Sequence, residues 1–99
     1  MTYKLAFKKS ALKEWQKLAP NIQQLFKKQL IKRLDNPHVA SAAVSGGKDL
    51  YKIKLRQLGY RLVYNVSDNI VTVTVLAVGE RDKNKVYDLA LSRLKIDQL

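Results

Sequence analysis

The sequence predicts a small α+β domain in which one strand precedes a helix hairpin and an antiparallel meander precedes a last helix. Two segments with apolar residues at helical spacing lie near the N-terminus, and a third lies near the C-terminus. Between them, three stretches rich in β-branched and aromatic residues are separated by turn residues. Grouped runs of helices and strands are typical of the α+β class. We therefore expect a single domain over residues 1–99, in the order β-α-α-β-β-β-α.

The N-terminal part is predicted to form a short strand and then two helices. Residues 2–7 alternate between polar or small and larger apolar side chains, as in a strand with one buried face. Ser10 is a candidate N-cap of the first helix. Pro20 suits the first turn of the second helix, which Asn36-Pro37 ends. The two apolar stripes are Ala11, Leu12, Trp15 and Leu18, then Ile22, Leu25, Phe26, Leu30 and Leu34. The basic residues on the outer faces of the two helices, Arg33 included, are interpreted as a solvated face, with RNA attraction as the less favoured alternative.

The C-terminal part is predicted to contain a loop, three strands and a helix. Residues 37–48 are small and polar, which indicates a loop. Strands are expected at 50–56, 60–66 and 70–78, with a hairpin turn at Asp68-Asn69. The last of these is apolar almost throughout, which predicts a central strand covered on both faces. A final helix is expected over residues 83–94.

Composition excludes several kinds of site. The chain has no cysteine and one histidine, His38, so the usual zinc sites, disulfides and thiolate nucleophiles are excluded. Its eight carboxylates are dispersed, so we expect neither a metal site nor a cofactor. We find no signal peptide and no apolar run of about 20 residues, which predicts a soluble cytoplasmic protein without a membrane partner. The net charge of +11 indicates a polyanionic partner, nucleic acid above all.

A cluster of cations in the predicted meander is the strongest functional signal. In a strand over residues 50–56, Lys52, Lys54 and Arg56 share one face. A turn containing Gly59 returns the chain, and Arg61 then joins that face. Like charges side by side destabilise a sheet, so such a cluster indicates a function rather than ordinary surface lysines.

Lysine, arginine and tyrosine are sufficient to cut RNA, because the 2′-hydroxyl of RNA can itself attack the adjacent phosphate. The enzyme must take a proton from that hydroxyl, stabilise charge on the phosphorane and protonate the leaving 5′-oxygen. Arginine suits the phosphate through its planar fork of donors. Lysine acts as a base only when neutral, and crowding by other cations favours the neutral form.

The chain resembles the RelE-type toxins of bacterial toxin–antitoxin pairs, which are ribosome-dependent mRNA endoribonucleases of the RelE/ParE superfamily. The resemblance runs from the first strand to about Leu94. It is carried by residues 11–18, by Tyr51-Lys52-Ile53-Lys54-Leu55-Arg56, by Gly59-Tyr60-Arg61-Leu62-Val63-Tyr64, and by Val78-Gly79, Arg81 and Val86-Tyr87.

The resemblance implies a role for each candidate catalytic residue. Lys52 and Lys54 would act near the 2′-hydroxyl, with Lys54 our choice for the base, while Arg61 would bind the scissile phosphate. Arg81 would contact the phosphate and help protonate the leaving oxygen, and Tyr87 would stack on an mRNA base. Arg56 and Lys48 are assigned to general RNA binding.

The resemblance also implies partners. These are an acidic RelB-like antitoxin, the A site of the small ribosomal subunit with its mRNA, and operator DNA reached only through the toxin–antitoxin complex. Two alternatives stay open: a ParE-like inhibitor of DNA gyrase, and a non-catalytic module that binds RNA or the ribosome. Glu80 departs from the family pattern, which generally has a basic or neutral residue there.

Overall fold

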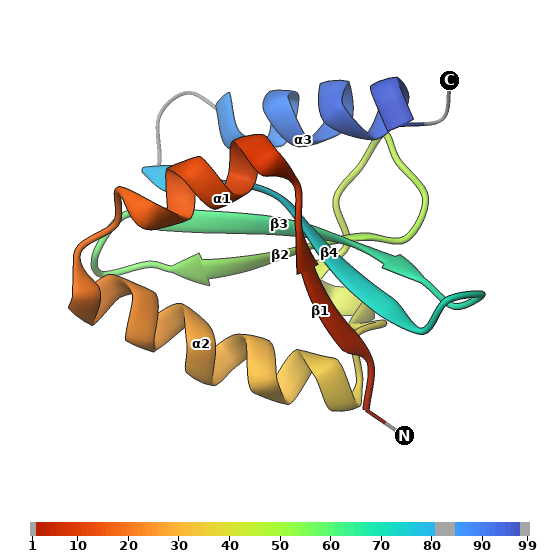
Figure 1. Cartoon of the computed structure of the whole chain (residues 1–99), viewed down its shortest axis with the longest axis horizontal. Helices are drawn as coiled ribbons and strands as arrows, with labels where there is room; N and C mark the ends of the chain where they lie inside the picture. The colour runs from red at the N-terminus through yellow and green to blue at the C-terminus, as the bar shows by residue number, and fades with distance from the viewer. Residues whose placement is uncertain (1, 81–84, 98–99) are drawn as a thin grey trace.

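The computed structural model describes residues 2–80 and 85–97, and the order of its elements is the predicted one (Figure 1). Strand β1 is followed by the helix hairpin α1–α2, by a short 3₁₀ helix, by the strands β2, β3 and β4, and by α3. Their bounds are β1 Lys4–Phe7, α1 Lys9–Gln16, α2 Pro20–Asp35, the 3₁₀ helix Ala40–Ala42, β2 Leu50–Leu55, β3 Tyr60–Ser67, β4 Thr72–Glu80 and α3 Lys85–Asp97.

The sheet of the described residues has the strand order β1-β4-β3-β2. Strands β2, β3 and β4 form the predicted antiparallel meander. Strand β1 lies beside β4 and runs parallel to it, with Lys4 opposite Thr72, so the sheet as a whole is mixed. A parallel neighbour requires a long crossover, which α1 and α2 begin and β2 and β3 complete. Strand β4 is central, as its apolar sequence predicts.

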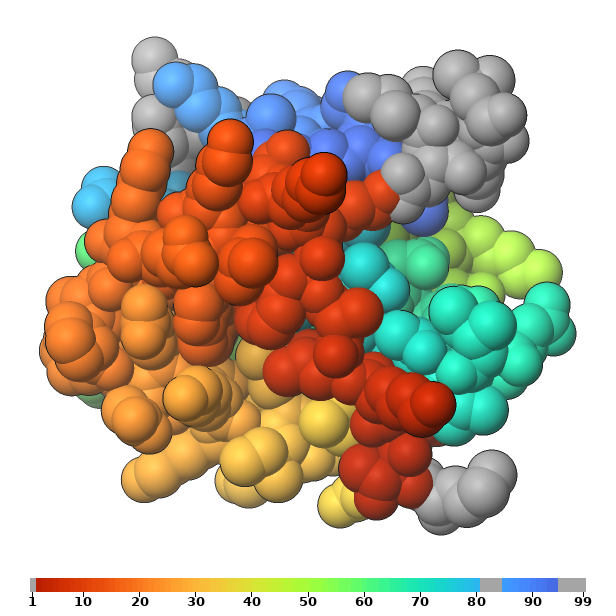
Figure 2. Space-filling model, in the orientation of Figure 1, coloured from red at the N-terminus to blue at the C-terminus, as the bar shows by residue number. Residues whose placement is uncertain are grey.

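Two hydrophobic cores lie on the two faces of the sheet. The helix hairpin covers one face with Trp15 and Phe26, which pack against Ile53 and Tyr64. On the other face α3 packs Val86 and Ala90 against a smaller core that includes Val63 and Leu76. The layers are visible in Figure 1, where α3 and α2 lie on opposite sides of the strands. In the space-filling view, the side chains of α1, β1 and α2 cover much of the facing surface (Figure 2).

Three details of the prediction are wrong. Ser10 is not an N-cap, because α1 already begins at Lys9 and its N-cap residue is Lys8. Strand β4 begins at Thr72 instead of Ile70, because residues 68–71 form the turn and Val71 takes a positive φ of 49°. Leu12 and Leu25 belong to the predicted apolar stripes but are about two-fifths exposed. Within the described residues, moreover, the helices lack the length and apolarity needed to cross a membrane.

Candidate nucleic-acid interface

The predicted cationic face forms where β2 pairs with β3. Lys54 lies directly opposite Arg61, and Lys52 lies opposite Val63. Between the two lysines, Ile53 points the other way and is 2% exposed in the core beneath the helix hairpin. The strand alternation that the sequence predicts therefore fixes both lysines and Arg61 on the face of the sheet that α3 partly covers.

Tyr87 reaches this face from α3. Its hydroxyl accepts a hydrogen bond of 2.9 Å from Nη1 of Arg61, whose Cζ lies 5.4 Å from the centre of the tyrosine ring. Nζ of Lys52 lies 5.9 Å from the same ring centre. Cations near an aromatic ring are attracted to its electron-rich face. Residues 52, 61 and 87, which are far apart in the sequence, thus form one cluster.

Lys54 and Arg56 line three hollows, of which one is also lined by Arg61 and another by Lys52. These two concern the cluster. The first, which we name the hairpin hollow, encloses about 270 Å³ at the β2–β3 turn. The second, which we name the edge hollow, encloses about 280 Å³ along the outer edge of β2. Lys54 and Arg56 line both. The hairpin hollow is lined by Lys54, Leu55, Arg56, Gly59, Tyr60 and Arg61, and the edge hollow by Arg33, Ser41, Ala42, Lys52, Lys54 and Arg56.

Of the other predicted residues, Lys48 lies apart from the cluster. Lys48 lies on the loop before β2 and lines a separate hollow of about 470 Å³, together with Asn65 and Leu94. Arg81 lies outside the described residues. The structure thus brings together Lys52, Lys54, Arg61 and Tyr87, and Arg56 lines the two hollows beside them.

Arg33 was interpreted from the sequence as part of a solvated helix face, and this interpretation is wrong. Its Nη1 donates hydrogen bonds to the backbone carbonyl of Lys52 at 3.2 Å and to the hydroxyl of Tyr64 at 2.9 Å. Tyr64 in turn donates to the carbonyl of Pro37 at 2.8 Å. A signal for this existed in the sequence, because Arg33 follows the buried Phe26 by seven residues, which is two helical turns.

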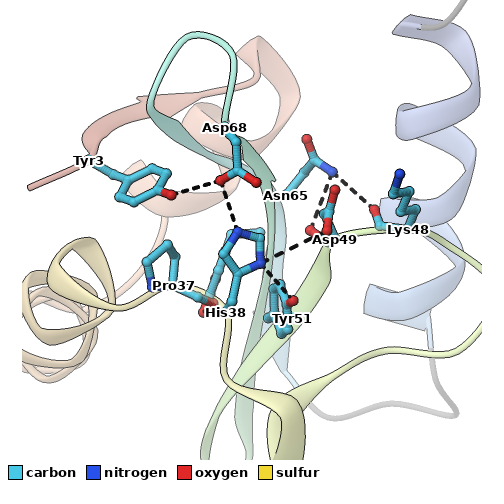
Figure 3. A network of polar contacts seen from close by, with 9 residues as sticks. Tyr3, Pro37, His38, Lys48, Asp49, Tyr51, Asn65 and Asp68 are labelled. Atoms are coloured by element: carbon cyan, nitrogen blue, oxygen red, sulfur yellow. Dashed lines mark hydrogen bonds and ion pairs between the residues drawn. The ribbon is translucent and has the colours of Figure 1, made fainter.

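His38 has exposed surface, as expected of a loop histidine, but it also joins a polar network that the sequence did not reveal (Figure 3). Its two ring nitrogens lie 2.9 Å from the Tyr51 hydroxyl and 2.9 Å from a carboxylate oxygen of Asp68. Tyr3 also donates to Asp68, at 2.7 Å. The hydrogen bonds from His38 and Tyr3 hold the pKa of Asp68 below its usual value. The network connects the residue before β1, the loop after α2, β2 and the β3–β4 turn.

Glu80 points away from the cationic face. It is paired with Tyr60, whose hydroxyl lies 3.4 Å from the Glu80 carboxylate. Arg61, one residue later on β3, is paired with Gly79. Because neighbouring residues of a strand point to opposite faces, Glu80 and Arg61 lie on different sides of the sheet.

An ion pair attaches α3 to the rest of the domain. Arg93 donates to both carboxylate oxygens of Glu14 on α1, at 2.9 and 3.2 Å, and to the backbone carbonyl of Leu76 at 2.7 Å. The backbone N–H of Val78 donates to Glu14 at 3.3 Å. Leu76 lies at an irregularity of the β3–β4 ladder and has no partner in its register. The ion pair therefore satisfies backbone groups of β4 next to a β-bulge.

In residues 2–80 and 85–97, histidine and carboxylate side chains form no group of three or more that could hold a metal ion.

Comparison with known proteins relates this arrangement to bacterial toxins. The model of the ParE toxin of the type II toxin–antitoxin system parDE matches residues 5–85. A RelE-like toxin protein of Escherichia coli is 53% identical over 95 residues, which are 96% of this chain and all of the relative. The mRNA interferase toxin RelE of E. coli strain K12 is 45% identical over 94 residues, which are 95% of this chain and 99% of the relative.

A solved structure extends the comparison to the fold. The crystal structure of the intact E. coli RelBE toxin–antitoxin complex contains a chain that is 44% identical and superposes with a TM-score of 0.79. The alignment covers 82% of this chain and 99% of that one.

Proposed function

Because the chain belongs to the RelE/ParE family of toxins from type II toxin–antitoxin systems, we propose that it is an endoribonuclease that cuts mRNA in the ribosomal A site. The observation that carries this proposal is the juxtaposition of Lys54 and Arg61 across the β2–β3 ladder, with Tyr87 bonded to Arg61. Such a site offers a base, an anion-binding fork and a stacking ring without a metal ion.

The geometry supports a separate chemical role for each of these groups. Arg61 would bind the scissile phosphate, because guanidinium presents parallel donors to two phosphate oxygens and stabilises the charge that develops there. Lys54 would take the proton of the 2′-hydroxyl, and Lys52, two residues away on the same face, would hold the adjacent ribose or phosphate.

Tyr87 would turn from Arg61 to the RNA when substrate binds. Its ring lies beside the cationic cluster, where a base next to the cleaved bond can stack on it. Stacking on an aromatic side chain contributes about 1–3 kcal/mol per base. Arg61 would exchange its hydrogen bond with the tyrosine hydroxyl for bonds to phosphate, which are stronger because both partners are charged. Arg81 would supply a further phosphate contact and the proton for the leaving oxygen.

The composition of the described site supports ribosome dependence. The described residues of the cluster include neither histidine nor carboxylate, so the acid–base groups are weak and the substrate must be held in a reactive geometry. Positioning can contribute as much as about 7–11 kcal/mol to lowering a barrier. We propose that the ribosome supplies this positioning for mRNA, so the protein would act in the cytoplasm.

An acidic antitoxin would neutralise the toxin. The relative in the E. coli RelBE complex is bound to its antitoxin. The net charge of +11 on this chain favours an acidic partner by electrostatic complementarity. We propose that a RelB-like chain covers the cationic face and that only the resulting complex contacts operator DNA.

The test compares the mapped 5′ ends of an mRNA incubated with translating ribosomes and of the same mRNA without ribosomes. Wild type is expected to give cuts only with ribosomes. Lys54→Ala should slow cutting about 10²–10⁴-fold and Arg61→Ala about 10²–10³-fold. Lys28→Ala, which removes one exposed cation from the outer face of α2, is the matched control and should cut normally. Intact mRNA in every reaction refutes the nuclease.

A ParE-like action is the second candidate, because the matching family model is that of the ParE toxin. Such a toxin would inhibit DNA gyrase and would not need the cationic cluster for RNA chemistry. Gyrase supercoiling that is inhibited equally by wild type and by Lys54→Ala, together with intact mRNA, would establish this alternative. A non-catalytic module would instead block translation without new 5′ ends, and its effect would decline steeply with salt.

A further inference from the structure

The edge hollow extends beyond Lys52 and Lys54 to Arg33 and Ser41, which have no role in the mechanism above, and its chemistry is that of an anion site. The residues that line it include four cations, Arg33, Lys52, Lys54 and Arg56, and the hydroxyl-bearing Ser41, but no carboxylate. Its volume of about 280 Å³ is close to that of the hairpin hollow. A concave surface lined by one sign of charge concentrates ions of the other sign.

Arg33 gives this hollow a fixed cation. Its Nη1 is hydrogen-bonded to the Lys52 carbonyl and to the Tyr64 hydroxyl, and its Cζ lies 5.8 Å from the centre of the Tyr64 ring. Tyr64 is fully buried and is itself bonded to the carbonyl of Pro37. An arginine held in this way loses little conformational entropy when its other donors bind an anion.

The two hollows are continuous through shared residues. Lys54 and Arg56 line both, so an anion in the edge hollow lies beside one in the hairpin hollow. A polynucleotide presents phosphates in a regular series along one strand. An RNA strand whose scissile phosphate meets Arg61 can therefore place a neighbouring phosphate against Arg33 as it crosses β2.

We propose that the edge hollow is a second phosphate subsite, which binds the RNA phosphate next to the scissile one through Arg33 and Ser41. This inference rests on the proposed function. The arginine fork and the serine hydroxyl would contact the phosphate oxygens and fix the register of the strand, without reading its bases. The fixed phosphate would hold the 2′-hydroxyl at Lys54.

The test measures binding of a fluorescently labelled RNA tetranucleotide in which one 2′-deoxyribose replaces the attacking ribose, so that no cleavage is needed. Each phosphate in turn is replaced by a neutral methylphosphonate. Ser41→Asp places a negative charge in the hollow at an exposed position, and Ser45→Asp makes the same charge change on the same loop outside the hollow. Arg33→Gln is a second variant, but it also removes a hydrogen bond from Tyr64.

Ser41→Asp is expected to weaken binding of the all-phosphate RNA about tenfold relative to Ser45→Asp, the usual size of one lost charged hydrogen bond. With the neighbouring phosphate neutralised, the two variants should bind alike. Equal affinities for all-phosphate RNA, or no binding by wild type, would overturn the subsite. The subsite would also be overturned if polyglutamate, an acidic peptide, bound as tightly as the RNA and its binding were weakened equally by Ser41→Asp. The protein could also fail to cut mRNA while Ser41→Asp still weakens RNA binding only when the neighbouring phosphate is charged. That result would refute the proposed nuclease activity and support the phosphate subsite.

Discussion

Replacing Arg93 by leucine should loosen α3 from the domain. The substitution keeps an apolar but shorter side chain and removes three hydrogen bonds, two to Glu14 and one to the Leu76 carbonyl. It leaves the Glu14 carboxylate without its cation and the Leu76 carbonyl without this donor. Leu76 lies at the irregularity of the β3–β4 ladder and has no partner in its register.

The expected loss of stability depends on how exposed the Arg93–Glu14 ion pair is. The side chains of Arg93 and Glu14 are 18% and 27% exposed, so the pair lies between a surface ion pair and a fully buried one. Exposed pairs contribute about 0–1 kcal/mol, and breaking buried pairs costs about 3–5 kcal/mol. We expect Arg93→Leu to lower the free energy of unfolding by about 2–3 kcal/mol, a large share of the ~5–15 kcal/mol typical of a small domain.

Urea unfolding of wild type, Glu14→Gln, Arg93→Leu and the double variant measures this prediction as a double-mutant cycle. The coupling free energy between the two positions should exceed about 1 kcal/mol. Amide hydrogen exchange should rise along α3 and much less along α2, which the ion pair does not contact. A coupling below about 0.5 kcal/mol, or protection of α3 unchanged from wild type, would refute the idea that this ion pair attaches the helix.

Three further predictions concern single side chains. Glu80→Gln should change mRNA cleavage by less than about threefold, because Glu80 lies on the face of the sheet opposite Arg61; a much larger gain in the mapped cuts would place its charge in the site. Burial raises the pKa of Tyr64, an effect that Arg33 partly offsets. The stability that this raised pKa contributes is therefore complete below pH 10.0, the ordinary tyrosine value, and is lost as the pH rises through the higher pKa of the folded state. Urea unfolding between neutral and alkaline pH should show this loss in wild type and less of it in Tyr64→Phe, and equal slopes would contradict the assignment. Finally, the lowered pKa of Asp68 contributes stability that is present above pH 3.8 and lost as the pH falls through its lower folded-state pKa. Carbon-detected NMR of the carboxyl groups should place its midpoint below 3.8, and His38→Ala should raise that midpoint; a midpoint at or above 3.8 in wild type would count against the network.

The elements and the cationic face could be predicted because their signals are local. Alternation in residues 51–56 assigns Lys52 and Lys54 to one face whatever lies beneath them. Pro20 and Asn36-Pro37 bracket α2 through their own backbone preferences. These signals do not depend on which segments meet in space.

The remaining features depend on long-range contacts and could not be predicted. The parallel pairing of β1 with β4 joins residues 68 positions apart, and no residue type in β1 specifies it. The spacing of Arg33 from Phe26 indicates the face of α2 on which Arg33 lies, but its hydrogen bond to Tyr64 depends on where β3 lies. His38 meets Asp68 and Tyr51 because the loop after α2, strand β2 and the β3–β4 turn converge. Arg81 lies outside the described residues, so its assignment stays a prediction from the resemblance.

The pairing of β1 with β4 also determines the order in which a growing chain can complete the domain. The β2–β3 hairpin, with Lys54 and Arg61, forms from neighbouring residues soon after synthesis. The partner of Lys4 is Thr72, and the partner of Glu14 is Arg93. The first strand and the first helix therefore cannot make these contacts until almost the whole chain has been synthesised. Loops of this length close slowly. Tyr87 therefore joins the cationic cluster last. In a chain that is still being translated, Lys52 and Lys54 lie on a domain that has not yet finished folding. The cationic cluster is complete only once α3 has been synthesised.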